Sequence, residues 1–201
     1  MSRFQSNRRL EKDQPIYDDD NEDTASPETR DNGHSNGGIQ NNTLFSKDYV
    51  NVRSRSYLMK ILSKQGDSKV LFADKVLKFT GSGKMKHRIL LITDFAIYVV
   101  DPDCDALKRR IALAAVEKLS LSELGDNFFA IIIPTEYDIL MASTRKAEIV
   151  NALVEATKSA SDYELDVLHS NRFEYNAAAD LVKVVQFEEV EGGVKTRIGR
   201  K

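Results

Sequence analysis

Four basic residues that lie close together in the sequence could bind a phosphate group. Lys78, Lys84, Lys86 and Arg88 surround a Gly81-Ser82-Gly83 break between two segments rich in β-branched and aromatic residues. Such a break is typical of the connection in a β-hairpin. Ammonium and guanidinium groups form charge-assisted hydrogen bonds with phosphate oxygens. The cluster therefore indicates either an anion-binding site or a group of solvated lysines, and both interpretations stay open on spacing alone.

The expected hairpin register decides which of these side chains share a face. If residues 81–85 form the loop, Lys78 faces Arg88 and Thr80 faces Lys86. Lys78, Lys86 and Arg88 then point to the same side of the hairpin, near its mouth. Like charges directly opposite each other destabilise a sheet. We therefore expect this cluster either to spread into solvent or to hold an anion.

The hairpin belongs to a longer series of short strands. The pattern predicts seven strands in all: 76–80, 87–93, 95–100, 108–113, 115–121, 128–133 and 137–142. A helix follows from about residue 145 to residue 159, with one apolar stripe. Seven strands closed by one helix predict an α+β fold, in which an antiparallel barrel is capped by the C-terminal helix.

The segment that begins at Leu44 has apolar residues spaced largely by threes and fours, which predicts an additional N-terminal helix. Its other face is basic and includes Arg53 and Arg55. Such a helix either packs against the core with its basic face in water or lies on a membrane surface. Packing against the core is favoured because the apolar residues are bulky. Arg53 and Arg55 are auxiliary candidates for facing a membrane.

Charge is distributed unevenly along the 201 residues, although the net charge is only −2. Residues 1–43 carry five Lys/Arg against nine Asp/Glu and are poor in apolar residues, which predicts a disordered acidic tail. Residues 44–88 carry eleven Lys/Arg against three Asp/Glu. Residues 191–201 are expected to form a flexible basic tail. The basic central segment indicates an anionic partner.

Several classes of function are disfavoured by the sequence. The three His residues are scattered and the single Cys104 has no local partner, so we expect no enzyme, metal site or cofactor. One cysteine and the lack of a long apolar run suggest a cytoplasmic protein that could meet membranes only peripherally. Nucleic-acid binding is disfavoured because no stacking motif accompanies the basic segment.

Three stretches resemble the tail-homology domain of class I myosins, a pleckstrin-homology-like module. They are residues 70–78, residues 88–98 with the run Arg-Ile-Leu-Leu-Ile-Thr-Asp-Phe-Ala-Ile-Tyr, and residues 119–129. The resemblance implies a domain at 44–190, with a pleckstrin-like core at about 70–160 and extra C-terminal strands at 163–169 and 181–187. The sequence contains no motor head, so we expect a free-standing tail domain.

The resemblance also implies a function. In that family a Lys on the first barrel strand and a basic residue on the second contact a phosphoinositide, and the matching positions are Lys78 and Arg88. The main hypothesis is therefore a peripheral module that binds anionic phospholipids through Lys78, Lys84, Lys86 and Arg88. The alternative is an adaptor for cytoskeletal or myosin-associated proteins on the same scaffold, without lipid specificity.

Overall fold

The structure is a computed structural model that describes residues 47–161 and 163–201. The predicted disordered tail at residues 1–43 lies outside these residues. The described chain contains two α-helices and many strands, so the α+β prediction is confirmed. The elements are β1 (Lys47–Asp48), α1 (Ser56–Gln65), β2 (Val70–Phe79), β3 (Met85–Thr93), β4 (Ala96–Asp101), β5 (Ala106–Ala112), β6 (Lys118–Leu121), β7 (Phe128–Ile132), β8 (Ile139–Ala142), α2 (Lys146–Ala160), β9 (Asp166–His169), β10 (Arg172–Ala178), β11 (Leu181–Val190) and β12 (Gly193–Arg200), with 3₁₀ turns η1 (Val52–Ser54) and η2 (Leu113–Ala115).

The main sheet is open, whereas the sequence predicted a closed seven-strand barrel. Its strands follow the order β5-β4-β3-β2-β8-β7-β6-β9, and β1 pairs with β2 beside this path. Among the described strands none joins β5 to β6, so the prediction of a closed barrel is wrong. Two features explain why β5 and β6 do not pair. The η2 turn separates β5 from β6, and the free edge of β6 pairs in parallel with β9 instead.

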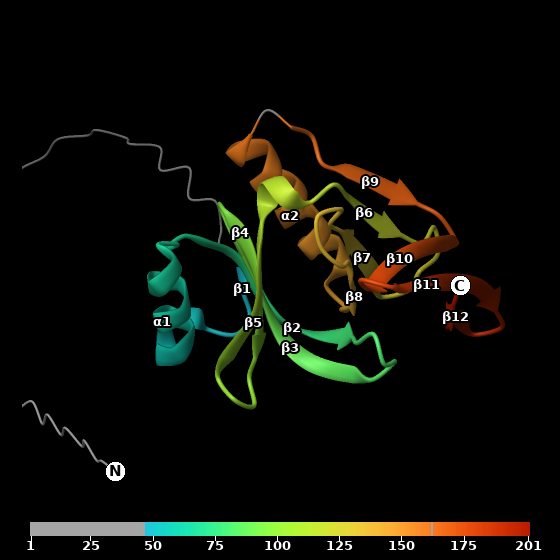
Figure 1. Cartoon of the computed structure of the whole chain (residues 1–201), viewed down its shortest axis with the longest axis horizontal. Coiled ribbons are helices and arrows are strands. Elements are labelled where there is room, and N and C mark those ends of the chain that lie inside the picture. Colours follow the sequence, from blue (N-terminus) through green and yellow to red (C-terminus); the bar gives the residue numbers. More distant parts are fainter. Residues whose placement is uncertain (1–46, 162) are drawn as a thin grey trace, which may run out of the picture. The chain divides into compact units, whose positions relative to one another are not determined.

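The two helices cover opposite faces of the β2–β5 part of this sheet (Figure 1). On the inner face, Ile149 and Leu153 of α2 pack into the same core cluster as Val76 of β2 and Leu90 of β3. The helix predicted at about 145–159 is thus confirmed to within a residue at each end. Complete burial of an apolar side chain of this size contributes about 1.5–3 kcal/mol, so α2 is held firmly on the sheet.

The outer face of the sheet is covered by α1. Leu58 and Leu62 of this helix are buried against Ala73, Ile89 and other residues of β2–β4. The N-terminal helix is shorter than the sequence pattern suggested, because η1 and β1 precede it. Its apolar stripe faces the core, which confirms the core-packing interpretation for this part of the segment.

A second, three-stranded sheet follows in the order β10-β11-β12. The prediction of a flexible tail at 191–201 is wrong, because β12 pairs with β11 from Gly193 opposite Val190 to Arg200 opposite Lys183. Val194 and Ile198 of β12 pack on a third apolar cluster that includes Phe173 and Val185. Alternating apolar residues therefore order the C-terminal strand.

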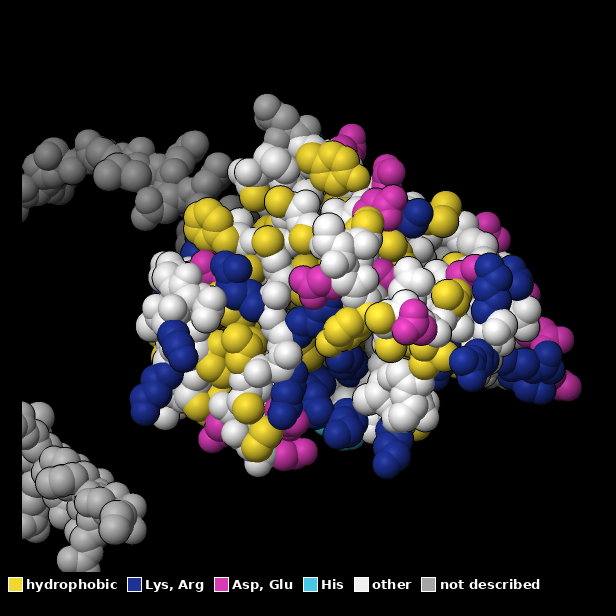
Figure 2. Space-filling model, in the orientation of Figure 1, with side chains coloured by type: hydrophobic (Ala, Val, Ile, Leu, Met, Phe, Trp, Pro, Cys, Tyr) yellow, Lys and Arg dark blue, Asp and Glu magenta, His cyan; other side chains and the backbone are white. Residues whose placement is uncertain are grey.

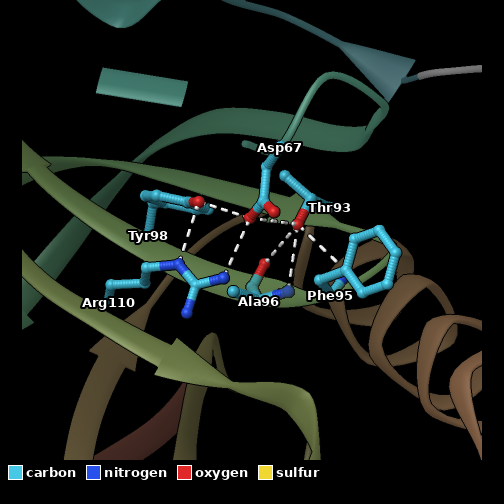
Figure 3. Close-up of polar contacts among 6 residues, drawn as sticks. All are labelled: Asp67, Thr93, Phe95, Ala96, Tyr98 and Arg110. Carbon is cyan, nitrogen blue, oxygen red and sulfur yellow. Dashed lines mark hydrogen bonds and ion pairs between the residues drawn. The ribbon is translucent and has the colours of Figure 1, made fainter. Parts of the chain in front are cut away.

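A buried polar network fixes the turn between β3 and β4 (Figure 3). The Thr93 hydroxyl accepts the backbone N–H groups of Phe95 and Ala96 at 3.2 and 3.0 Å. The carboxylate of Asp67 accepts hydrogen bonds from the Tyr98 hydroxyl and from Arg110. Burial, followed by the hydrogen bond to Asp67, raises the pKa of Tyr98 to about 12. The Thr-Asp-Phe stretch of the sequence motif therefore has a structural role.

Candidate functional site: a basic mouth on the main sheet

The β2–β3 hairpin has a different register from the one predicted. Lys78 lies opposite Lys86, and Val76 lies opposite Arg88. The difference arises in the turn, which is shorter than expected because Thr80 closes it: the backbone N–H of Thr80 donates to the Lys84 carbonyl at 2.9 Å, and its side-chain hydroxyl accepts the Lys84 N–H at 3.0 Å.

The prediction that three basic side chains share one face survives this correction. The observed pairing differs from the predicted pairing by an even number of residues, so Lys78, Lys86 and Arg88 still point to the same side. That side is the inner face of the sheet, because Val76 and Leu90 on the same face belong to its core cluster. The basic residues therefore continue the inner face beyond the apolar core, toward the turn of the hairpin.

Further charged residues meet this group from other strands. We define the basic mouth as Lys78 of β2, Lys86 and Arg88 of β3, and Lys108 and Arg109 of β5, together with the acidic residues Asp101 and Glu136. Five positive charges thus face two negative charges. In Figure 2, Lys and Arg side chains gather in the lower middle of the view, where Figure 1 places β2, β3 and β5. This excess of positive charge suits an anion.

Arg88 is held inside the protein by an ion pair. Its guanidinium lies 3.1 Å from the Asp101 carboxylate, and the Arg88 side chain is only 8% exposed. It also donates to the backbone carbonyl of His87 at 2.6 Å. Burial favours a higher pKa for Asp101, but the backbone N–H of Asp103 and the charges of Arg88 and Lys108 outweigh it and lower that pKa. Arg88 therefore has a structural partner in the unliganded protein.

The environment of Lys78 differs from that of Arg88. Its side chain is half-buried, and no salt bridge is formed by it within residues 47–161 and 163–201. Desolvation, the charge of Arg109 and the charge of Arg88 all lower the pKa of Lys78. The protonated ammonium is thus held at a free-energy cost, which an anion beside it would relieve.

Sequence reasoning missed Arg109 of the basic mouth and Tyr137, which lies beside it. The guanidinium of Arg109 lies 4.0 Å from the centre of the Tyr137 ring, and the Lys78 ammonium lies 5.8 Å from the same ring. Arg109 also donates to Glu136 at 2.8 Å, while its other terminal nitrogen is buried without a hydrogen-bond partner in the structure. Side-chain alternation along β5 is a signal that could have placed Arg109 on the inner face of the sheet. The contact of Tyr137 with Arg109 depends on the tertiary fold.

The remaining predicted site residues lie in two different places. Lys84 is exposed on the β2–β3 turn, beside Lys86. Arg53 belongs to η1 and is exposed, and Arg55 precedes α1, where its side chain donates to the Val50 carbonyl at 2.8 Å. Since α1 packs on the outer face of the sheet, the structure does not bring Arg53 and Arg55 to the basic mouth.

The described part of the chain contains neither a membrane-spanning helix nor a metal-binding cluster of side chains. None of its described helices is long and apolar enough to cross a membrane. Across the same residues, no three His, Cys, Asp or Glu side chains come together in a way that could hold a metal ion.

Comparison with known proteins identifies relatives of this chain. The chain is 30% identical over 158 residues to myosin heavy chain IB of Acanthamoeba castellanii, an alignment that covers 75% of this chain and 14% of that protein. It is 29% identical over 154 residues to myosin IB heavy chain of Dictyostelium discoideum, which covers 73% of this chain and 14% of that protein. The similarity therefore spans only a small part of each relative.

Solved structures with partial similarity in backbone include one with a PH domain in its description. The hSac2 domain of the human phosphoinositide phosphatase Sac2 superposes with a TM-score of 0.45 at 13% identity, over 57% of this chain and 87% of that one. The linker-DH/PH domains of p115-RhoGEF superpose with a TM-score of 0.41 at 11% identity, over 60% of this chain and 38% of that one.

The family comparison covers most of the chain. A family model described as unconventional myosin tail, actin- and lipid-binding, matches residues 36–200, which include both sheets and both helices. This tail region is a binding module rather than a catalytic domain. The match confirms the resemblance drawn from residues 70–78, 88–98 and 119–129, and the chain belongs to the family of myosin I tail-homology domains.

Proposed function

We propose that this tail domain attaches to membranes by binding anionic phospholipids, including phosphoinositides, at the basic mouth. The observation that carries the proposal is Lys78, a half-buried ammonium without a salt bridge among the described residues, whose pKa is lowered by desolvation and by Arg109 and Arg88. A lipid phosphate would supply the missing negative charge. The family description, which names lipid binding, supports the same function.

The basic residues have different roles in this proposal. Lys78 and Lys86 lie opposite each other and would contact the phosphate from two strands. Lys84 is exposed on the turn and would add attraction toward the lipid surface. Arg88 would act mainly through its charge and through its ion pair with Asp101, because a direct phosphate contact would require it to exchange a partner.

The tip of the hairpin also suits a lipid surface. Met85 is 62% exposed and stands between Lys84 and Lys86. An apolar side chain flanked by two lysines can enter the headgroup region while the ammonium groups stay with the phosphates. Met85 would therefore add burial of apolar surface to the electrostatic attraction.

A second candidate function is binding to actin filaments or to other cytoskeletal proteins. The family description names actin as well as lipid, so this candidate has its own support. The basic mouth could also meet an acidic protein surface, because its excess of positive charge is not specific for lipids.

One experiment separates the two candidates. The protein is sedimented with phosphatidylcholine vesicles, with vesicles that also contain phosphatidylserine or phosphatidylinositol bisphosphate, and with actin filaments. We expect co-sedimentation with both kinds of anionic vesicle and none with the neutral vesicles. Binding to actin filaments combined with equal, weak binding to all vesicles would favour the cytoskeletal function and contradict the lipid proposal.

A further inference from the structure

The turn of the β2–β3 hairpin carries a serine close to the basic mouth. Ser82 is exposed and lies between Gly81 and Gly83, neither of which has a side chain that could cover it. Its hydroxyl has one hydrogen bond among the described residues, at 3.0 Å to the hydroxyl of Thr80. Ser82 is therefore an accessible hydroxyl group beside the proposed lipid site.

The turn keeps its shape without the Ser82 hydroxyl. The N–H of Gly83 donates to the Thr80 carbonyl at 2.9 Å, and the N–H of Thr80 donates to the Lys84 carbonyl at 2.9 Å. The Thr80 hydroxyl adds two more bonds, because it accepts the Lys84 N–H and donates to the Lys84 carbonyl, both at 3.0 Å. A group added to Ser82 would leave these bonds in place, whereas the same group on Thr80 would break two of them.

Lysines from both sheets stand near this serine. Lys84 and Lys86 follow it on the hairpin, and Lys183 reaches the turn from β11, since a Cβ at Gly83 would lie 4.0 Å from the Lys183 ammonium nitrogen. None of these three side chains forms an ion pair within residues 47–161 and 163–201. A phosphate attached to Ser82 would therefore meet ammonium groups that have no other anionic partner there.

The sequence around Ser82 suits a protein kinase that selects basic substrates. Lys84 and Lys86 follow the serine by two and four residues, and Lys78 precedes it by four. Kinases choose among hydroxyl groups largely by the pattern of charge around them. Exposed turns built from small residues are also the parts of a fold that other enzymes reach most easily.

We propose that Ser82 is a phosphorylation site that switches off the binding of anionic lipids. In this step the Ser82 Oγ attacks the γ-phosphorus of a nucleoside triphosphate held by the kinase. An O–P bond forms, the bond from that phosphorus to the β,γ-bridging oxygen breaks, the nucleoside diphosphate leaves, and the hydroxyl proton passes to the catalytic base of the kinase. The inference rests on the proposed lipid function and adds its regulation.

The attached phosphate acts on the lysines that a lipid would use. Phosphoserine carries a charge of about −1.5 to −2 at neutral pH, so it cancels about two of the positive charges at the hairpin. It pairs with Lys84 or Lys183 inside the same chain, and it repels the phosphates of the lipid surface. Lipid binding weakens although every residue of the basic mouth is unchanged.

The test compares two forms of the full chain, one with phosphoserine incorporated during synthesis at residue 82 and one with it at residue 68. Ser68 is the matched control, because it is exposed just before β2 and its phosphate adds the same charge. The start of β2 lies about 25 Å from Lys78 at the usual rise of a strand, and charges this far apart are screened at physiological salt. Thermal unfolding checks that both forms are folded.

Binding is measured by sedimentation with vesicles containing phosphatidylinositol bisphosphate or, at matched surface charge, phosphatidylserine. We expect phosphorylation of Ser82 to weaken binding to both kinds of vesicle by at least about tenfold relative to the unmodified chain. Phosphorylation of Ser68 should weaken it by less than about twofold. No loss with phosphorylated Ser82, or an equal loss with the control, would overturn the inference.

A second measurement needs no lipid. Phosphorus NMR follows the second pKa of each phosphate, which is about 6 for a free phosphoserine. We expect this pKa to be lower at Ser82 than at Ser68, because neighbouring ammonium groups favour the doubly charged phosphate. Equal values would show that the lysines do not hold the phosphate and would contradict the proposed switch.

Access for a kinase is tested on the unmodified chain. The full chain is incubated with ATP and the catalytic domain of protein kinase C, and the modified residues are located by mass spectrometry. We expect phosphate at Ser82 and its loss from that peptide in Ser82→Ala. Phosphate on other residues with none on Ser82 would overturn the assignment of the site.

The proposed function fails separately from this inference. If Lys78→Met leaves binding to both kinds of anionic vesicle unchanged, the basic mouth is not the lipid site, whatever the phosphate on Ser82 does. If Lys78→Met weakens binding and phosphorylation of Ser82 does not, only the switch is wrong.

Discussion

Arg88 of β3 and Asp101 of β4 form a buried ion pair, with 3.1 Å between the guanidinium nitrogen and the carboxylate oxygen. Resemblance to the family had suggested Arg88 as a direct phosphate ligand. The pair shows that Arg88 also holds two neighbouring strands together. Lys78 and Arg88, which the sequence presented as equivalent, should therefore respond very differently to substitution.

Replacing Arg88 should destabilise the protein. In Arg88→Ala the Asp101 carboxylate loses the guanidinium at 3.1 Å and, within the described residues, keeps Lys108, at 3.5 Å, and the backbone N–H of Asp103. We expect a loss of about 3 kcal/mol in the free energy of unfolding, measured by urea denaturation. The double variant Arg88→Ala/Asp101→Ala should recover part of this loss. A loss below about 1 kcal/mol in the single variant, typical of an exposed pair, would contradict the buried role.

Replacing Lys78 should leave the fold intact. Desolvation and the charges of Arg109 and Arg88 disfavour the protonated ammonium, so Lys78→Met removes an unfavourable charge. We expect the free energy of unfolding at neutral pH to stay the same or to rise by about 0.5 kcal/mol, as for relief of one like-charge pair. Urea denaturation beside the parent protein measures it. A clear loss of stability would mean that the Lys78 side chain has a favourable partner.

Lys78 should also report the binding of an anion. Its pKa is lowered in the unliganded protein, and a phosphate beside it would favour the charged form. We therefore expect the pKa of Lys78 to rise when soluble inositol bisphosphate is added, followed by NMR of reductively methylated lysines. Lys75, on the same strand but on the opposite face, serves as the internal control. Equal shifts at both lysines would indicate only diffuse attraction.

Two buried tyrosines should make the protein sensitive to strong alkali. Tyr98 and Tyr175 both have pKa values of about 12 in the folded state, against about 10 for an unfolded tyrosine. Because the folded state keeps these two protons up to a higher pH than the unfolded state does, the stability that the tyrosines contribute is complete below about pH 10. It is lost as the pH rises toward about 12.

Urea denaturation between about pH 9 and pH 12 measures this loss. Tyr175→Phe should make the decline less steep, because the variant has one tyrosine fewer to ionise and no hydrogen bond is lost with it. A decline as steep as in the parent protein would show that Tyr175 ionises without unfolding.

Local patterns in the sequence predicted much of the fold and part of the site. Helix α2 was located to within a residue at each end because its apolar stripe is periodic and its neighbours break the pattern. The shared face of Lys78, Lys86 and Arg88 was predicted correctly because side chains alternate along a strand, although the turn was taken to be longer than it is. Alternation along a strand determines on which face of the sheet a side chain lies, whereas the length of the turn determines which residue lies opposite it on the next strand.

The features that were missed depend on contacts between distant parts of the chain. Closure of the barrel could not be decided, because it depends on whether β6 pairs with β5 or with β9, and both are possible for a short apolar strand. Asp101, Arg109 and Tyr137 reach the basic mouth from three other segments, and nothing near Lys78 in the sequence points to them. β12 did carry a local signal, the alternation of Val194, Thr196 and Ile198, which its basic residues obscured.

The most direct test of the account compares two lysines of the same strand. Lys78 faces the basic mouth, while Lys75 is exposed on the other face, opposite Ile89, so Lys78→Met and Lys75→Met make the same change in net charge. Affinity is measured by co-sedimentation with vesicles containing phosphatidylinositol bisphosphate. We expect Lys78→Met to weaken binding by at least about fivefold, corresponding to about 1 kcal/mol, and Lys75→Met to weaken it much less. Equal effects of the two variants would contradict a lipid site at the basic mouth.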